Sequence, residues 1–203
     1  MGGRTRGPGA QHELRRAEIA DAVLAVVADL GPAAVSLSEV AARAGVSPGR
    51  VQHYFPTKDR LITTAFERGN ALSTARIERK VAEAASPAAP RTVVTVVLVE
   101  LIPYDAATRD HLRVRHSFGA LALTDEAIAT RLRAEYAHLH DRLARLLERD
   151  RDAGLLREDA DAREAAVSLV ALAEGLAYYV LVGVEQTEAA RGRLLRAIDG
   201  YYR

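Results

Sequence analysis

Residues 36 to 61 carry the pattern of two short helices joined by a tight turn. Ser36 is followed three residues later by Glu39, the capping-box spacing that satisfies free backbone N–H groups at a helix start. Gly45 stands where a helix end favours a residue in the left-handed conformation. The pattern therefore predicts a first helix of about two turns that stops at Gly45.

A second helix start follows directly after this turn. Ser47 can cap it, and Pro48 suits its first position because the missing N–H has no partner to lose there. Val51 and Phe55 lie four residues apart and are expected to face the core of the motif. Together the two helices predict a helix-turn-helix, which places its second helix in a DNA major groove.

The other side of the second helix is expected to meet DNA. Arg50 can bridge guanine O6 and N7, and Gln52 can pair with adenine N6 and N7, so these two are the predicted base-reading residues. His53 and Tyr54 are also expected to be exposed, although Tyr54 can instead pack and His53 can instead sit on a solvated face.

The composition excludes several classes of protein. In 203 residues, 49% are hydrophobic and 27% charged, which is typical of a globular chain. The absence of cysteine excludes disulfides and thiolate metal sites. Neither a signal-peptide core nor an uncharged apolar run of 18 residues occurs, so a cytoplasmic protein without membrane contact is expected. The basic residues are concentrated at the start: residues 1 to 80 carry 12 Lys or Arg against 8 Asp or Glu. That excess suits phosphate neutralisation near the motif.

The rest of the chain predicts an all-α protein of about nine helices, with a three-helix helix-turn-helix domain and a C-terminal helical bundle. Residues 1 to 10 are predicted to be a flexible tail, whose Arg4 and Arg6 are alternatively an arm for a minor groove. The predicted DNA-binding domain covers residues 11 to 56, and the ligand-binding and dimerisation domain covers 57 to 203, with a linking helix at 57 to 84. Residues 91 to 103 suit either a buried strand or a helix, and a helix is favoured because no partner strand is evident.

The stretches GVSPG at 45 to 49 and HYFPTKDRL at 53 to 61 resemble the tetracycline-repressor-like (TetR) family of bacterial transcriptional regulators. The resemblance implies a homodimer, a three-helix DNA-binding domain and a variable C-terminal domain whose small-molecule ligand releases DNA. At the matching positions, Ser47, Tyr54 and Lys58 suit phosphate contacts. The complete predicted DNA-binding set is Ser47, Pro48, Gly49, Arg50, Gln52, His53, Tyr54 and Lys58. Many members of the family place Thr or Ala at the position of Arg50 and Tyr at that of Gln52, so the operator preference is expected to be this chain's own.

Two helices near the C-terminus carry apolar rows that suit pairing with a second copy, as the matching helices of the family do. The predicted dimer residues are Leu169, Leu172, Leu176, Leu194, Ile198 and Tyr201. The alternative is simple burial within one chain. Two recognition helices must also lie about 34 Å apart, or a multiple of this, to read successive half-sites, which itself favours a dimer.

Polar side chains on apolar helices are the clue to a ligand site. The predicted ligand-binding residues are Tyr104, His111, Arg115, Phe118, Glu174 and Tyr178, with His116 and Tyr136 as further candidates. The alternative for each is an ordinary core residue whose hydrogen bonds are satisfied. His138 and His140 are two residues apart on a helix, so their rings diverge and no metal or cofactor is expected.

The sequence thus predicts a transcriptional regulator that binds a double-stranded DNA operator, most simply a repressor released by an unidentified small-molecule effector. The alternative is an architectural or constitutive DNA-binding protein without such an input. An enzyme is not expected, because the chain has no nucleophile elbow, P-loop or histidine pair at i,i+4.

Overall fold

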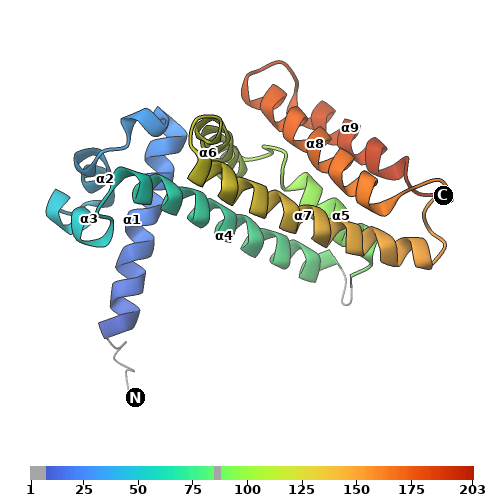
Figure 1. Ribbon diagram of the computed structural model, residues 1–203, viewed down its shortest axis with the longest axis horizontal. Helices are drawn as coiled ribbons and strands as arrows, with labels where there is room; N and C mark the ends of the chain where they lie inside the picture. The colour runs from blue at the N-terminus through green and yellow to red at the C-terminus, as the bar shows by residue number, and fades with distance from the viewer. Residues whose placement is uncertain (1–7, 85–87) are drawn as a thin grey trace.

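The computed structural model describes residues 8–84 and 88–203, and within them it is all-α, as predicted (Figure 1). The helices are α1 (Pro8–Leu30), a short 3₁₀ turn η1 (Pro32–Ala34), α2 (Leu37–Ala44), α3 (Pro48–Tyr54), α4 (Lys58–Ala84), α5 (Pro90–Val99), α6 (Ala106–Ala122), α7 (Glu126–Asp152), α8 (Ala162–Leu181) and α9 (Thr187–Asp199).

The predicted tail is too long. Residues 8 to 10 already belong to α1, because Pro8 suits the first turn of a helix, where its missing N–H is not needed. The N-terminal turns of α1 extend beyond the helices that pack on the rest of it (Figure 1). Arg4 and Arg6, the candidate minor-groove arm, lie outside the described residues.

The predicted caps of the helix-turn-helix are confirmed. The backbone N–H of Glu39 donates to Ser36 Oγ at 3.1 Å, and that of Arg50 donates to Ser47 Oγ at 3.3 Å. Gly45 ends α2 with φ 63°, the left-handed conformation that costs a residue with a Cβ more than it costs glycine. Val51 and Phe55 are buried as expected, so the orientation of α3 is fixed by its own apolar residues.

Two hydrophobic cores lie along the molecule, and α4 belongs to both. The N-terminal core joins α1, α2 and α3 to the first turns of α4 and also takes Val114 and Phe118 from α6. The C-terminal core is built by α5, α7, α8 and α9, and α4 contributes Ile77 to it. The packing of the N-terminal core therefore does not end at residue 56, and α4 connects the two cores as one uninterrupted helix of 27 residues.

The ambiguous segment is a helix. Pro90 occupies the start of α5, and Val94, Val97 and Leu98 are buried at the i, i+3, i+4 spacing of one helical face. Tertiary packing on α7, α8 and α9 outweighs the β-propensity of the valine run.

Of the predicted dimer residues, Leu169, Leu176, Leu194 and Ile198 are buried in the C-terminal core of their own chain, which fits the alternative of simple burial within one chain. Leu172 is 37% exposed and Tyr201 is half-buried. The accessible apolar side of α8 is a different one, which we call the outer face of α8. It consists of Val167, Ser168, Ala171, Leu172, Gly175, Tyr178, Tyr179 and Val182.

By length and composition alone, α8 is also apolar enough to cross a membrane, and 44% of its 18-residue apolar window is buried within the protein. Its inner side is part of the C-terminal core, so its hydropathy has a structural explanation without a bilayer.

Candidate DNA-binding interface and effector cavity

The recognition helix α3 presents the predicted polar residues on its free side. Arg50, Gln52 and His53 are exposed, and Tyr54 is half-buried. Within the described residues, no carboxylate lies within 4.0 Å of the Arg50 guanidinium, so its hydrogen-bond donors are available to a DNA base. Ser47, Pro48 and Gly49 are exposed at the N-terminus of the helix. Pro48 has no N–H and the Arg50 N–H donates to Ser47, so the backbone N–H of Gly49 is the one that suits a phosphate there.

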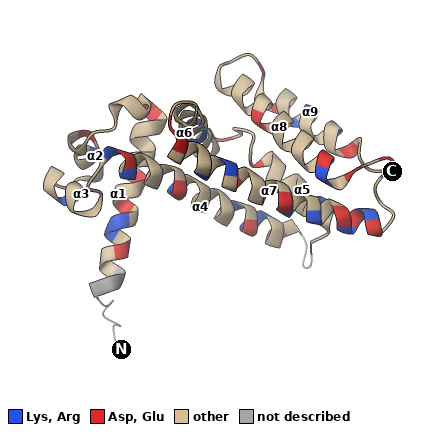
Figure 2. Ribbon diagram, viewed as in Figure 1, with Lys and Arg blue, Asp and Glu red and all other residues tan. Residues whose placement is uncertain are grey.

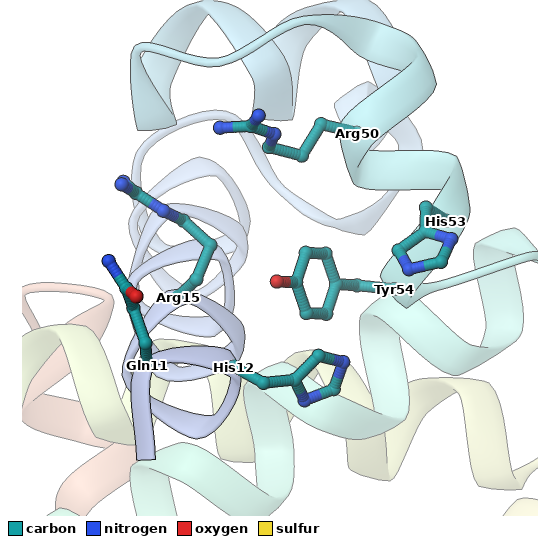
Figure 3. Close-up of a pocket in the computed structure, with 6 residues that line it drawn as sticks. All are labelled: Gln11, His12, Arg15, Arg50, His53 and Tyr54. Atoms are coloured by element: carbon teal, nitrogen blue, oxygen red, sulfur yellow. The ribbon is translucent and has the colours of Figure 1, made fainter. Parts of the chain in front are cut away.

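A polar groove of about 470 Å³ runs between α3 and the start of α1 (Figure 3). Tyr54 stands in its middle, with Arg50 and His53 from α3 and three side chains from α1 around it. The contributors from α1 are Gln11, His12 and Arg15. The ring centroids of Tyr54 and His12 are 4.7 Å apart, so Tyr54 both packs against α1 and directs its hydroxyl into the groove.

These three α1 residues were not among the predicted DNA contacts. Gln11 and Arg15 are four residues apart and therefore share a helical face, a signal that the sequence does carry. What the sequence does not reveal is that this face lies opposite α3. The groove places Arg15 of α1 on the same side as Arg50 of α3, and Arg15 also pairs with Glu18 at 2.5 Å; both acidic and basic residues lie along this part of α1 (Figure 2).

Lys58, at the first position of α4, is exposed and donates from Nζ to the carbonyl oxygen of Ala33 at 3.0 Å. This bond ties α4 to the turn that precedes α2. An ammonium has three donors, so one bond leaves the others free for a phosphate.

A second hollow lies between α4, α5, α6 and α7 and has a volume of about 140 Å³. We call it the effector cavity because it is the candidate ligand site. Two predicted ligand residues, His111 and Arg115, line it and are buried. The other residues around it are Asn70, Ser73, Thr74, Ile77, Val97, Leu101, Glu135, His138, Leu139 and Arg142.

The other four predicted ligand residues do not line the effector cavity. Phe118 stacks on Phe66 with ring centroids 4.0 Å apart and belongs to the N-terminal core. Tyr178 is half exposed on the outer face of α8. Glu174 and Tyr104 are partners of cations instead: the Arg115 Nε donates to Glu174 at 2.6 Å, and Tyr104 bonds both Lys80 and Glu100.

His111 is held between α4 and α6. Its Nε2 lies 3.2 Å from Asn70 Oδ1, and a Cβ at Gly69 would come within 2.7 Å of its ring. Glycine at position 69 therefore allows the close approach of the two helices. Burial, reinforced by the charges of Arg115 and Arg76, lowers the pKa of His111 to about 3, so the imidazole is neutral at physiological pH.

Replacing His111 by Gln is expected to flatten the acid dependence of stability. Unfolding restores an ordinary pKa near 6.5, so the unfolded chain binds a proton that the folded chain excludes. The contribution of the neutral His111 to the free energy of unfolding is full above pH 6.5. It falls by about 1.4 kcal/mol per pH unit down to about pH 3. Urea unfolding at pH 6.5, 5.5 and 4.5 measures the slope. Asn70→Ala keeps the buried imidazole and should keep the slope, and equal slopes in H111Q and the unchanged protein would contradict the assignment.

Comparison with known proteins gives matches over both parts of the chain. The model for bacterial regulatory proteins of the tetR family matches residues 19–65, and the model for the C-terminal region of BetI-type transcriptional repressors matches residues 90–201. The HTH-type transcriptional regulator PksA of Bacillus subtilis is 28% identical over 92% of this chain and 87% of its own length.

Solved structures of similar fold match almost the whole length of this chain. A putative TetR-family transcriptional regulator from Rhodococcus sp. superposes with a TM-score of 0.81 at 26% identity, covering 94% of this chain and 100% of that one. A putative transcriptional regulator from Saccharomonospora viridis, solved in complex with choline, superposes with a TM-score of 0.79 at 26% identity. The match covers 93% of this chain and 97% of that one.

Proposed function

This chain belongs to the TetR family of bacterial transcriptional regulators and is a DNA-binding regulator of the repressor type; we propose that a small molecule in the effector cavity releases it from its operator. The observation that carries this proposal is the position of the cavity. Its lining includes α4 and α6, and both helices also pack into the N-terminal core that supports α3.

The coupling route is short. His111 and Arg115 line the cavity, while Val114 and Phe118 on the same helix pack into the N-terminal core. A ligand that favours one spacing of α4 and α6 therefore favours one orientation of the recognition helix. Coupling of about 1 to 3 kcal/mol changes operator affinity roughly 5- to 150-fold.

On the DNA side, Arg50 and Gln52 are proposed to read bases, and Ser47, Tyr54 and Lys58 to bind phosphates, with Pro48, Gly49 and His53 completing the contact surface. The groove adds Gln11, His12 and Arg15 from α1. A groove lined by cationic and polar groups beside the recognition helix suits the sugar–phosphate backbone that flanks the bases being read.

A homodimer is proposed through the outer face of α8. Its residues recur at spacings of three and four, and the small residues Ser168, Ala171 and Gly175 lie among large apolar ones. Contiguous apolar surface of this kind is rare on a monomer and allows close helix approach. The helix α8 lies at the end of the molecule away from α3, so pairing through it leaves the recognition helices free (Figure 1).

Arg50→Ala is expected to weaken binding to the preferred operator by about 1 to 3 kcal/mol and to relax preference at one base position. A binding-site selection with the variant measures both effects. Lys58→Ala is the matched control: it should weaken all sequences alike and reduce the dependence of affinity on salt by about one ion. An unchanged base preference in R50A would contradict the role of Arg50.

The regulatory proposal is tested on the full chain in two steps. A binding-site selection should return two symmetric half-sites separated by about one helical turn or a multiple. Operator affinity is then measured with each small molecule that raises the melting temperature. Release by at least one such molecule is expected. Sequence-independent binding would favour the architectural alternative, and ligands that bind without changing operator affinity would contradict effector control.

A further inference from the structure

The effector cavity lacks the groups that hold a quaternary ammonium. Such cations are bound over aromatic faces, and none of the described residues around this cavity is Phe, Tyr or Trp. Its apolar side is aliphatic instead, formed by Ile77, Val97, Leu101 and Leu139. The cavity therefore differs in chemistry from a site that suits choline, the ligand named for the Saccharomonospora structure.

Its polar side includes two guanidinium groups. Arg115 is buried in the floor and Arg142 is half-buried on α7. Glu174, which does not line the cavity, pairs with Arg115 at 2.6 Å. No carboxylate among the described residues lies within 4.0 Å of Arg142. Glu135 is the only acidic residue in the lining and is exposed, where water screens its charge.

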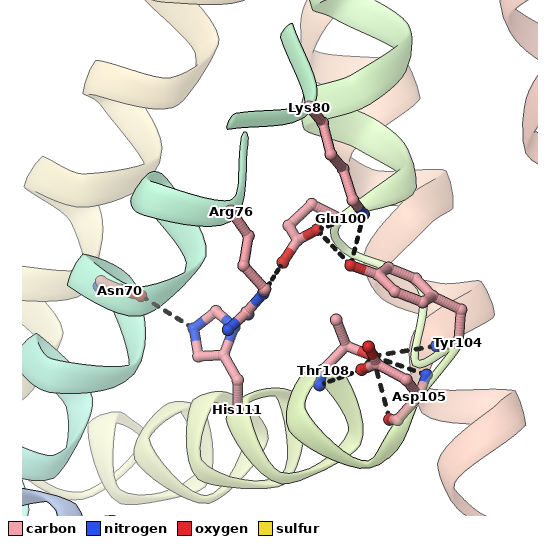
Figure 4. A network of polar contacts seen from close by, with 8 residues as sticks. All are labelled: Asn70, Arg76, Lys80, Glu100, Tyr104, Asp105, Thr108 and His111. Atoms are coloured by element: carbon pink, nitrogen blue, oxygen red, sulfur yellow. Dashed lines mark hydrogen bonds and ion pairs between the residues drawn. The ribbon is translucent and has the colours of Figure 1, made fainter. Parts of the chain in front are cut away.

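Next to this floor, two further cations share one buried carboxylate (Figure 4). Glu100 is fully buried and accepts from Arg76 Nε at 2.5 Å and from Lys80 Nζ at 3.2 Å. The other nearby carboxylate, Asp105, is exposed and bonds to Thr108 rather than to either cation. Glu100 thus contacts two cations, of which Lys80 is 32% exposed, and the charge of Asp105 also acts on both of them.

Two buried polar atoms in this region also have no hydrogen-bond partner among the described residues. They are Arg76 Nη2 and His111 Nδ1, and Arg76 extends from Glu100 toward the His111 ring (Figure 4). A buried guanidinium N–H without an acceptor is costly. The neutral His111 ring donates from Nε2 to Asn70 Oδ1, so its Nδ1 is an acceptor, and the unmet donor in this region is Arg76 Nη2, on a residue outside the cavity lining.

We propose that the ligand of the effector cavity is a small carboxylate, whose oxygens face Arg115 and Arg142 and whose short hydrocarbon chain packs on the aliphatic side. This inference rests on the proposed function, since it names the chemical class of the effector. A cavity of roughly 150 Å³ holds a molecule of the size of benzene, so about six non-hydrogen atoms fit here. Butyrate has that size.

The test compares three probes of similar size by isothermal titration with the full chain: butyrate, its neutral analogue butyramide, and choline. Butyrate is expected to bind with a dissociation constant of about 1 mM or below, and butyramide and choline at least about tenfold more weakly, because a charge-assisted bond to a guanidinium is lost. Equal or tighter binding of butyramide or choline, or no binding of butyrate, overturns the proposal.

Arg142→Met tests the site itself. Arg142 has no ion-pair partner in the described structure, so the variant should fold normally and bind butyrate about tenfold more weakly. Arg145→Met is the matched control, three residues further along α7, exposed and outside the lining. Equal butyrate affinity in R142M and R145M overturns the placement.

Operator affinity measured with saturating butyrate separates the two proposals. If butyrate binds as expected but operator affinity stays constant, the ligand class stands and effector control fails. If another molecule releases the operator while butyrate does not bind, effector control stands and the carboxylate proposal fails.

Discussion

Replacing Glu100 by Gln is expected to lower the free energy of unfolding by about 3 kcal/mol. The carboxylate is fully buried and holds Arg76, Lys80 and the hydroxyl of Tyr104, which donates to it at 2.7 Å. The glutamine amide is nearly the same size as the carboxylate that it replaces. The stability lost is therefore that of a negative charge opposite two cations. The effect lies at the lower end of the range for breaking a buried pair, because Lys80 is 32% exposed and keeps part of its hydration.

Urea unfolding followed by circular dichroism, at one fixed protein concentration, measures this loss. Glu83→Gln is the control, since Glu83 is on α4 as well but is 68% exposed and lies 3.9 Å from Arg79. It should change stability by at most a few tenths of a kcal/mol. Equal stabilities of E100Q and E83Q would show that the cluster around Glu100 contributes little to holding α4 against α5.

The local features of the helix-turn-helix were predictable because neighbouring residues determine them. Ser36, Gly45 and Ser47 act on backbone groups within three or four positions of themselves, and each takes the predicted conformation or bond. Burial of Val51 and Phe55 follows from a four-residue spacing alone. The groove between α1 and α3 brings together residues more than 30 positions apart, such as Arg15 and Arg50, and no local pattern specifies such a meeting.

The helix α8 shows a different limit. It is apolar on several sides, so its sequence cannot distinguish the side that packs on its own chain from the side left for another. Leu169 and Leu176 pack on their own chain, whereas Leu172 lies on the accessible side.

The predicted ligand residues also fall into two groups: some line the effector cavity, and others contact partners elsewhere in the chain. His111 and Arg115 lie four apart on α6 and both reach the effector cavity. Tyr104 is bound instead by Lys80, a residue 24 positions away, and Phe118 by the ring of Phe66.

Leu172→Glu, on the outer face of α8, is expected to convert the proposed dimer into monomers. Leu172 lies near the middle of the outer face of α8, and a carboxylate there would meet the apolar surface of the partner without a counter-charge. The fold should survive, because the side chain is already 37% exposed in the single chain. Sedimentation at micromolar concentration measures the state of assembly.

Operator affinity should fall together with the dimer. Two recognition helices on one dimer bind the second half-site at a high effective concentration, so separating them is expected to cost about 100-fold or more in affinity. Leu123→Glu is the matched control: it makes the same change at a leucine that is 86% exposed at the end of α6, away from the outer face of α8. A dimeric L172E protein would exclude this face as the interface. A monomeric L172E protein with unchanged operator affinity would mean that one helix-turn-helix suffices for DNA binding.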